Sequence, residues 1–227
     1  MKPTLLVYLL VTLTAAVCMF ALTQTPAPTK GISVELPKTT SAATLADADN
    51  PDAWILTVTR HGTLFFGTLP GKPEELFGEM QSRPRHRAQE IYIKADAQAP
   101  FDKVERALDL ARQAMFRRAY MLTSQPSETQ SATPVPPKGL LVWFAVEPGS
   151  HPSVLTIATS DTQLTLKLDD QKIAENELQN RLQQLLQSRA GRNVIVKTAS
   201  IPWADVVRIL DICNLAGAEV VIEKQEI

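Results

Sequence analysis

The stretch PFDKVERALDLARQA, residues 100–114, has a near copy later in the chain: PWADVVRILDICNLA, residues 202–216. The two stretches lie 102 positions apart, share Pro, Val, Arg, Leu, Asp and Ala, and carry an aromatic residue after each proline. In the first stretch apolar residues recur at helical spacing, and proline suits the first turn of a helix. The pair therefore predicts the same buried helix twice, and an internal repeat.

The segments around the two helices predict the same order of elements twice. In the first half we expect strands at 54–59 and 63–66 around the turn Arg60-His61-Gly62, then a helix, a strand, the repeated helix and a strand, at 73–82, 90–95, 100–115 and 118–122. In the second half the matching elements are expected at 154–158, 163–168, 173–188, 193–197, 203–215 and 219–223. The predicted fold class is therefore α/β, an α+β sandwich with two tandem ββαβαβ domains.

Proline-rich and polar segments set the expected boundaries. Residues 23–123 are expected to form the first domain and residues 139–227 the second, joined by a proline-rich linker at 124–138. Each domain begins with a short extended segment that ends on proline, Gly31–Pro37 and Gly139–Pro148. Lys38–Pro51, rich in Thr, Ala and Asp, is interpreted as a loose linker.

The N-terminus predicts a membrane anchor at residues 1–22. Leu5–Leu22 is an uncharged run of eighteen residues, at the lower edge of the roughly 17–25 residues that cross a bilayer. Lys2 then favours a cytoplasmic N-terminus, with the rest of the chain outside. A cleaved signal peptide is the alternative, but its apolar region is normally shorter and no small-x-small cleavage site follows at once.

Charge and cysteine content exclude several other classes. The net charge is −1, with 21% charged and 44% hydrophobic residues, so nothing steers the chain toward nucleic acid. The only dense basic run, Arg83-Pro84-Arg85-His86-Arg87, is interpreted as a solvated loop rather than a binding patch. Cys18 and Cys213 lie in the apolar run and in a helical pattern, so no disulfide is expected between them.

Each half resembles the periplasmic domain of the ExbD/TolR family. In the first half the resemblance is carried by Leu36-Pro37, Thr57–Gly62, Ile93–Asp96, Pro100-Phe101-x-x-Val104 and Leu108-Asp109. In the second half it is carried by Val194–Lys197, Pro202-Trp203-x-x-Val206, Leu210-Asp211 and Ala216–Ala218.

The resemblance implies a single-span inner-membrane protein that works as a dimer with a multi-span ExbB/TolQ-like subunit. Such a complex couples proton flow to force on an outer-membrane system. Family members usually carry one copy of the domain, so two copies imply either a homodimer or an internal pseudo-dimer within one chain. The partners expected are that subunit and the lipid bilayer, with no nucleic acid.

The expected span departs from the family in one respect. The family's span carries an aspartate that takes up and releases the proton. Between Leu5 and Leu22 this chain offers only Tyr8, Thr12, Thr14 and Cys18. Threonine hydroxyls do not titrate, and free Tyr and Cys have pKa values of about 10 and 8.5. The sequence therefore predicts an accessory subunit without its own proton carrier.

No catalytic, cofactor-binding or metal-binding residue is assigned. His61, His86 and His151 are spread over different loops without metal-ligand spacing. Asp169-Asp170 is typical of a turn, and Asp96 has no counterpart in the second half, where Ala199 aligns.

Arg106 with Asp109, and Arg208 with Asp211, are expected to pair along their helices. The sequence thus predicts a protein that is not an enzyme. The alternative to a transport subunit is a periplasmic structural or sensory module that recruits peptides by strand addition at edge strands and at the segments beginning at Gly31 and Gly139.

Overall fold

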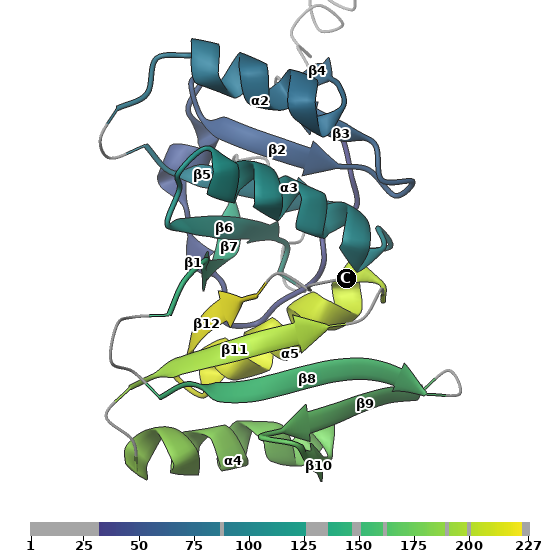
Figure 1. Ribbon diagram of the computed structural model, residues 1–227, viewed down its shortest axis with the longest axis vertical. Helices are drawn as coiled ribbons and strands as arrows, with labels where there is room; N and C mark the ends of the chain where they lie inside the picture. The colour runs from purple at the N-terminus through teal and green to yellow at the C-terminus, as the bar shows by residue number, and fades with distance from the viewer. Residues whose placement is uncertain are drawn as a thin grey trace, which may run out of the picture. The chain divides into compact units, whose positions relative to one another are not determined.

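One mixed sheet of twelve strands joins the two halves of the chain (Figure 1). The computed structural model describes residues 32–86, 89–125, 136–146, 151–160, 163–188, 191–198 and 201–223. These residues belong to one compact unit, Gly31–Ile227. We call residues 32–125 the N-terminal half and residues 136–223 the C-terminal half.

The N-terminal half contains six strands, two α-helices and a short 3-10 helix. In chain order they are β1 (Ala43–Thr44), η1 (Ala46–Asp49), β2 (Trp54–Val58), β3 (Leu64–Phe66), β4 (Leu69–Pro70), α2 (Pro73–Ser82), β5 (Ile91–Ala95), α3 (Phe101–Gln113) and β6 (Arg118–Thr123). From β2 onward the order is strand, strand, short strand, helix, strand, helix, strand.

The C-terminal half begins with β7 and then follows the same order. Its elements are β7 (Lys138–Trp143), β8 (Ser153–Ser160), β9 (Gln163–Leu168), β10 (Gln171–Ile173), α4 (Glu175–Ser188), β11 (Asn193–Thr198), α5 (Trp203–Leu215) and β12 (Glu219–Ile222). Three short strands, β1, β4 and β10, were not predicted from the sequence, because two or three residues give no periodicity.

The strand order is β10-β9-β8-β11-β12-β7-β6-β5-β2-β3-β4. In each half three strands are parallel, β2 with β5 and β6, and β8 with β11 and β12. An antiparallel hairpin extends each set outward. Strand β7 connects the sets, because it pairs antiparallel with β6 over its whole length and parallel with β12 at Trp143–Val221.

A continuous hydrophobic core runs through both halves. It contains the apolar faces of the four α-helices in the described residues and of the strands beneath them. Figure 1 shows α3 and α5 beside each other where the halves meet. There Phe101 stacks on Trp203, with ring centroids 6.1 Å apart and both side chains buried.

The first turns of α3 and α5 cap one another. Neither Pro100 nor Pro202 provides a side-chain cap, so the free N–H groups of each first turn need other acceptors. The Phe101 N–H donates to the Ile201 carbonyl and the Trp203 N–H donates to the Ala99 carbonyl, each at 2.8 Å. The prolines themselves form an antiparallel bridge. The repeated stretches therefore meet in space.

Most of the predicted elements are confirmed, and the mixed α/β class with a large sheet is as expected. The helix at Pro73–Ser82 has the predicted bounds. The helix predicted from Ile173 instead begins at Glu175, because Ile173 ends β10. The interpretation of Lys38–Pro51 as a loose linker is wrong, since this segment forms β1 and η1.

Two predicted segments lie outside the described residues. They are the expected membrane span, Leu5–Leu22, and residues 126–135 of the expected linker. Among the residues that the structure describes, no helix has the length and apolar character needed to cross a membrane.

Replacing Trp203 with Ala should destabilise the whole described unit. The side chain is fully buried, and removing a buried aromatic residue costs about 3–5 kcal/mol. Because both halves share one core, chemical denaturation of the full chain in detergent should show a single transition shifted to lower denaturant. Leu215→Ala, at an exposed position of the same helix, should change stability by less than about 1 kcal/mol. Two separate transitions, with only one of them shifted, would contradict a shared core.

Candidate functional site: a strap across both halves

Residues 35–45 form an extended segment that is hydrogen-bonded to both halves. We call this segment the strap. Figure 1 draws it in purple, leading into β1. The strap makes hydrogen bonds and strand pairs with four other parts of the unit. Its contacts are therefore the first place to look for function.

The first attachment is at the end of β5. The buried carboxylate of Asp96, 8% exposed, accepts a hydrogen bond from the Glu35 N–H at 3.2 Å and one from the Gln98 N–H at 3.0 Å. The Ala97 N–H in turn donates to the Glu35 carbonyl at 2.7 Å. Asp96 thus fixes the start of the strap and the loop after β5 together.

The second attachment is at the end of β6. The Ser124 N–H donates to the Pro37 carbonyl, and the Thr39 N–H donates to the Ser124 carbonyl, both at 2.9 Å. The hydroxyl of Thr39 donates to that of Thr123 at 2.8 Å, and both side chains are buried. Lys38 and Ser124 form an isolated parallel bridge, so the strap is paired with the residue that follows β6.

The third attachment crosses to the C-terminal half, where Asp211 of α5 receives four hydrogen bonds. The Thr40 N–H and hydroxyl donate to one carboxylate oxygen at 2.8 and 2.9 Å. The Ser41 N–H donates to the other at 3.0 Å, together with the Ser41 hydroxyl. Asn214 adds a bond to the Ser41 hydroxyl at 2.9 Å. An ionised carboxylate bonded to two N–H groups and two hydroxyls is a strong, charge-assisted anchor.

These bonds change the acidity of Asp211. Burial by itself raises the pKa of the carboxyl, but the hydrogen bonds from Ser41 and Thr40 outweigh burial and hold the pKa below its ordinary value. The folded state therefore favours the ionised form more than the unfolded state does. The anchor contributes its full stability above the ordinary pKa of aspartate and loses it as the pH falls through the depressed value.

The fourth attachment is to β7. Ala43 and Thr44 pair antiparallel with Gly139 and Lys138, and the Leu45 N–H donates to the Pro137 carbonyl at 2.7 Å. A Cβ at Gly139 would come within 2.6 Å of the Met121 carbonyl oxygen and 2.7 Å of the Leu45 side chain. Glycine at this position therefore allows the strap to lie directly over β6 and β7.

Apolar side chains of the strap cover the sheet face of the N-terminal half opposite the helices. Leu36 and Leu45, with Ala48 of η1, pack on Ile55, Tyr92, Leu122 and Tyr120. All of β2 is buried for this reason. The strap is thus a packed layer as well as a hydrogen-bonded connection.

The matching position of α3 also reaches across the joint between the halves. Asp109 pairs with Arg112 at 2.6 Å, and Arg112 donates to the Ile222 carbonyl of β12 at 2.7 Å. Arg112 and Asn214 are themselves 102 positions apart. Helix α3 therefore holds β12 through Arg112, and α5 holds the strap through Asp211 and Asn214.

The predicted pairing of Arg208 with Asp211 is wrong. Arg208 forms ion pairs with Glu175 and with Asp205, the latter at 3.1 Å, whereas Asp211 is bonded to Thr40 and Ser41. The sequence did contain a signal. Asp211 falls four residues after Val207 on the apolar stripe of α5, where a carboxylate needs buried hydrogen-bond donors.

The histidines do not form a site. The structure places His61 in the β2–β3 turn, His86 after α2 and His151 before β8. Within the described part of the chain, no group of three or more His, Cys, Asp or Glu is arranged to hold a metal ion. Asp169 and Asp170 both have positive φ, 47° and 65°, and form the β9–β10 turn as predicted.

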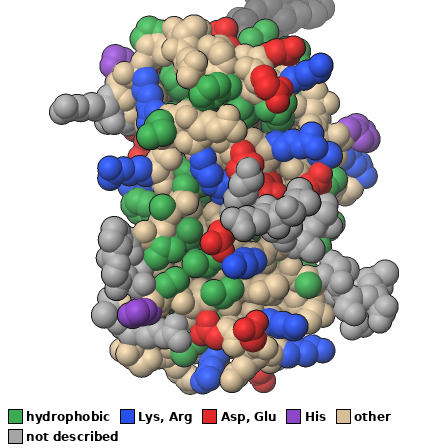
Figure 2. Space-filling view, viewed as in Figure 1, with side chains coloured by type: hydrophobic (Ala, Val, Ile, Leu, Met, Phe, Trp, Pro, Cys, Tyr) green, Lys and Arg blue, Asp and Glu red, His purple; other side chains and the backbone are tan. Residues whose placement is uncertain are grey.

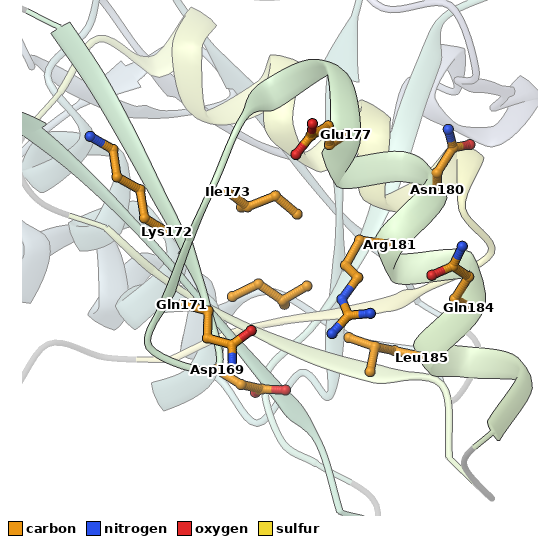
Figure 3. A pocket seen from close by; sticks show the side chains of 10 residues that line it. Asp169, Gln171, Lys172, Ile173, Glu177, Asn180, Arg181, Gln184 and Leu185 are labelled. Carbon is orange, nitrogen blue, oxygen red and sulfur yellow. The ribbon is translucent and has the colours of Figure 1, made fainter.

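A groove of about 540 Å³ lies between the β9–β10 hairpin and α4 (Figure 3). Leu168, Ile173 and Leu185 give it apolar walls, and Gln171, Asn180 and Gln184 place amides around it. In Figure 3 the guanidinium of Arg181 points into the space between hairpin and helix. The lining offers hydrogen-bonding and apolar contacts but no nucleophile paired with a base.

Asp211→Asn should loosen the strap and remove an acid-sensitive term from stability. The amide loses the charge and one acceptor, which we expect to cost about 2–3 kcal/mol at pH 7. The difference from the unmodified chain should shrink as the pH falls below the ordinary pKa of aspartate. Denaturation at pH 7 and pH 3 measures this, with Asp205→Asn, a partly exposed carboxylate of the same helix that pairs with Arg208, as control. An equal difference at both pH values would contradict an ionised anchor.

Comparison with known protein families identifies the family of the N-terminal half. Residues 5–126 match the family profile described as biopolymer transport protein ExbD/TolR. No curated protein and no solved structure matches the chain. The matched region takes in the apolar run, the strap and every element through β6, which is more than half of the 227 residues. The chain therefore belongs to the ExbD/TolR family of biopolymer transport proteins.

Proposed function

We propose that the chain is a single-span subunit of an energy-transducing inner-membrane complex, and that the strap passes force between the anchor and both halves. Proteins of this family are generally inner-membrane proteins that work with ExbB/TolQ-like partners. The observation that carries the proposal is the set of attachments at Asp96, Ser124, Asp211 and Gly139, which tie the strap to β5, β6, α5 and β7. A loosely tethered domain would need none of them.

We further propose that the two halves are two ExbD/TolR-like domains that form an internal pseudo-dimer. The family profile ends at residue 126, so the assignment of the C-terminal half rests on the repeated element order and strand pairing. The reciprocal capping of α3 and α5 supports it, because equivalent groups contact equivalent groups as across a two-fold axis.

The subunit is proposed to be an accessory form that does not carry protons itself. Leu5–Leu22 contains no carboxylate, and an intramembrane carboxylate is the group that the family uses. Protons would then pass through other subunits of the complex, and this chain would contribute binding and mechanical coupling. Consistent with this role, we propose that it is not an enzyme.

Co-purification tests the transport role. The full-length chain, tagged at the C-terminus and extracted in mild detergent from its own host, should bring down a multi-span membrane subunit in fixed ratio. A variant lacking residues 2–22, which removes the expected span, should lose that subunit. Recovery of the full chain as a partnerless protein would contradict the proposal.

A second candidate function is peptide recognition by the groove at β10. Since Lys38 already bridges to Ser124 and β7 is paired with β6, β12 and β1, we place strand addition at β10 rather than at the segments beginning at Gly31 and Gly139. Strand β10, by contrast, ends the sheet and pairs only with β9 among the described strands. At the equivalent place in the N-terminal half, a Cβ at Gly71 would come within 3.0 Å of the Leu76 side chain.

Arg181→Gln tests this second function. A random peptide library displayed on phage and selected on the full chain should yield extended sequences with an acidic residue beside apolar ones. We expect their affinity to fall about tenfold in the Arg181→Gln variant, equivalent to about 1.4 kcal/mol. Arg60→Gln, exposed in the β2–β3 turn, serves as the control. Selection of no peptides, or equal loss in both variants, would reject the groove as a peptide site.

A further inference from the structure

A second, smaller pocket lies at the other end of β5 from the strap. Asp96, which holds the strap, follows β5, whereas Glu90, which lines this pocket, precedes it. The pocket measures about 350 Å³, and it is lined mainly by Arg85, Met115, Phe116, Arg117, Arg118 and Trp143. Neither the family match nor the proposed transport role accounts for it.

Arg85, in the exposed loop at residues 83–86 that the sequence predicts, supplies part of this pocket. The Arg85 guanidinium lies 3.7 Å from the Phe116 ring centroid and donates to the Ala114 carbonyl at 2.5 Å. Burial lowers the pKa of Arg85. Arg83 of the same run covers the rings of Trp54 and Phe66. Both arginines are therefore fixed against the aromatic end of the core.

The pocket carries more positive than negative charge. Arg118 pairs with Glu90 at 2.6 Å and lies 5.5 Å from the Trp143 ring centroid. Arg117 forms no recorded ion pair with the residues that the structure describes. Three guanidinium groups therefore face one carboxylate. Guanidinium groups bind phosphate in a bidentate manner, which suits them to an anionic ligand.

Met115 adds an exposed apolar group at the cost of backbone strain. It has φ 61° and its side chain is 80% exposed. The equivalent residue of the C-terminal half is Gly217, with φ 82°, the residue type that normally fills this left-handed position after a helix. The left-handed conformation is unfavourable for methionine, and the largely exposed side chain is available for a contact outside the described residues.

We propose that this pocket binds the phosphate of an anionic phospholipid, with Arg85 and Arg117 on the phosphate and Met115 and Trp143 against the apolar part. A free inorganic anion would use the arginines but not the exposed methionine. Aromatic side chains and arginines are the groups typical of the membrane interface. The proposal uses the family's membrane location and is independent of the proposed transport role.

The chain is long enough to allow this contact. Twelve residues separate the end of the expected span, Leu22, from the start of the strap, Glu35. Extended, they reach at most about 40 Å, more than the roughly 17 Å spanned by a five-residue strand such as β5. The strap and the pocket can therefore lie at opposite ends of β5 while the pocket meets the lipid surface.

Hydrogen–deuterium exchange of the full chain in lipid nanodiscs tests the proposal. In nanodiscs of phosphatidylglycerol, residues 83–86 and 114–118 should exchange several-fold more slowly than in phosphatidylcholine. The difference should shrink as NaCl is raised from 50 to 500 mM. Arg117→Gln and the double change Arg85→Gln/Arg117→Gln should abolish it. Arg60→Gln/Arg192→Gln, with the same loss of charge at exposed positions outside both pockets, should retain it.

Met115→Gly separates binding from folding. It should raise the melting temperature, because the strain of the left-handed position is relieved, while reducing the protection from exchange in phosphatidylglycerol.

Equal exchange in the two lipids would overturn the proposal. It would also be overturned if inorganic phosphate, added to the chain in detergent, produced the same protection, since the pocket would then take a free anion. Arg117→Gln alone keeps the test decisive if Arg85→Gln unfolds the chain.

Discussion

The reciprocal capping of α3 and α5 is the interaction on which the rest of the structure depends. Each helix begins directly after a proline and has no side-chain cap of its own. Separating the halves would leave the N–H groups of Phe101 and Trp203 without acceptors and would expose the stacked rings. Both costs fall on buried groups, where unpaired donors are most unfavourable. The two halves are therefore bound to one another through the starts of their main core helices.

That junction also positions the strap. Asp211 lies on α5, and α5 is oriented by the contact of its first turn with Ala99. The strap can meet Asp211 only if α5 lies beside β6 and β7, as β7 ensures by pairing with both β6 and β12. Figure 2 shows acidic and basic side chains interspersed over the face in view, without one dominant sign. On that face the charges do not form a broad field of one sign, so specific contacts between residues are the distinguishing feature of the molecule.

The sequence predicted the repeated helices, most strands and the β9–β10 turn, because periodicity and turn residues act locally. It did not predict that the halves share one sheet, since strand pairing across a chain junction has no local signature. It also misjudged Lys38–Pro51, whose Thr40 and Ser41 look like ordinary linker residues until Asp211 is brought beside them. Asp211 itself was detectable as a carboxylate on an apolar stripe. The contacts of Arg83 with the Trp54 ring and of Arg85 with the Phe116 ring could not be predicted, because those rings are distant in sequence.

The difference between Met115 and Gly217 follows from having both halves in one chain. In a dimer of identical subunits every substitution occurs twice, so a strained residue that serves one surface burdens the other as well. When equivalent positions are encoded separately, one copy can keep the glycine that favours folding while the other departs from it. Duplication within a chain thus frees each half to specialise while the contact between the halves is kept.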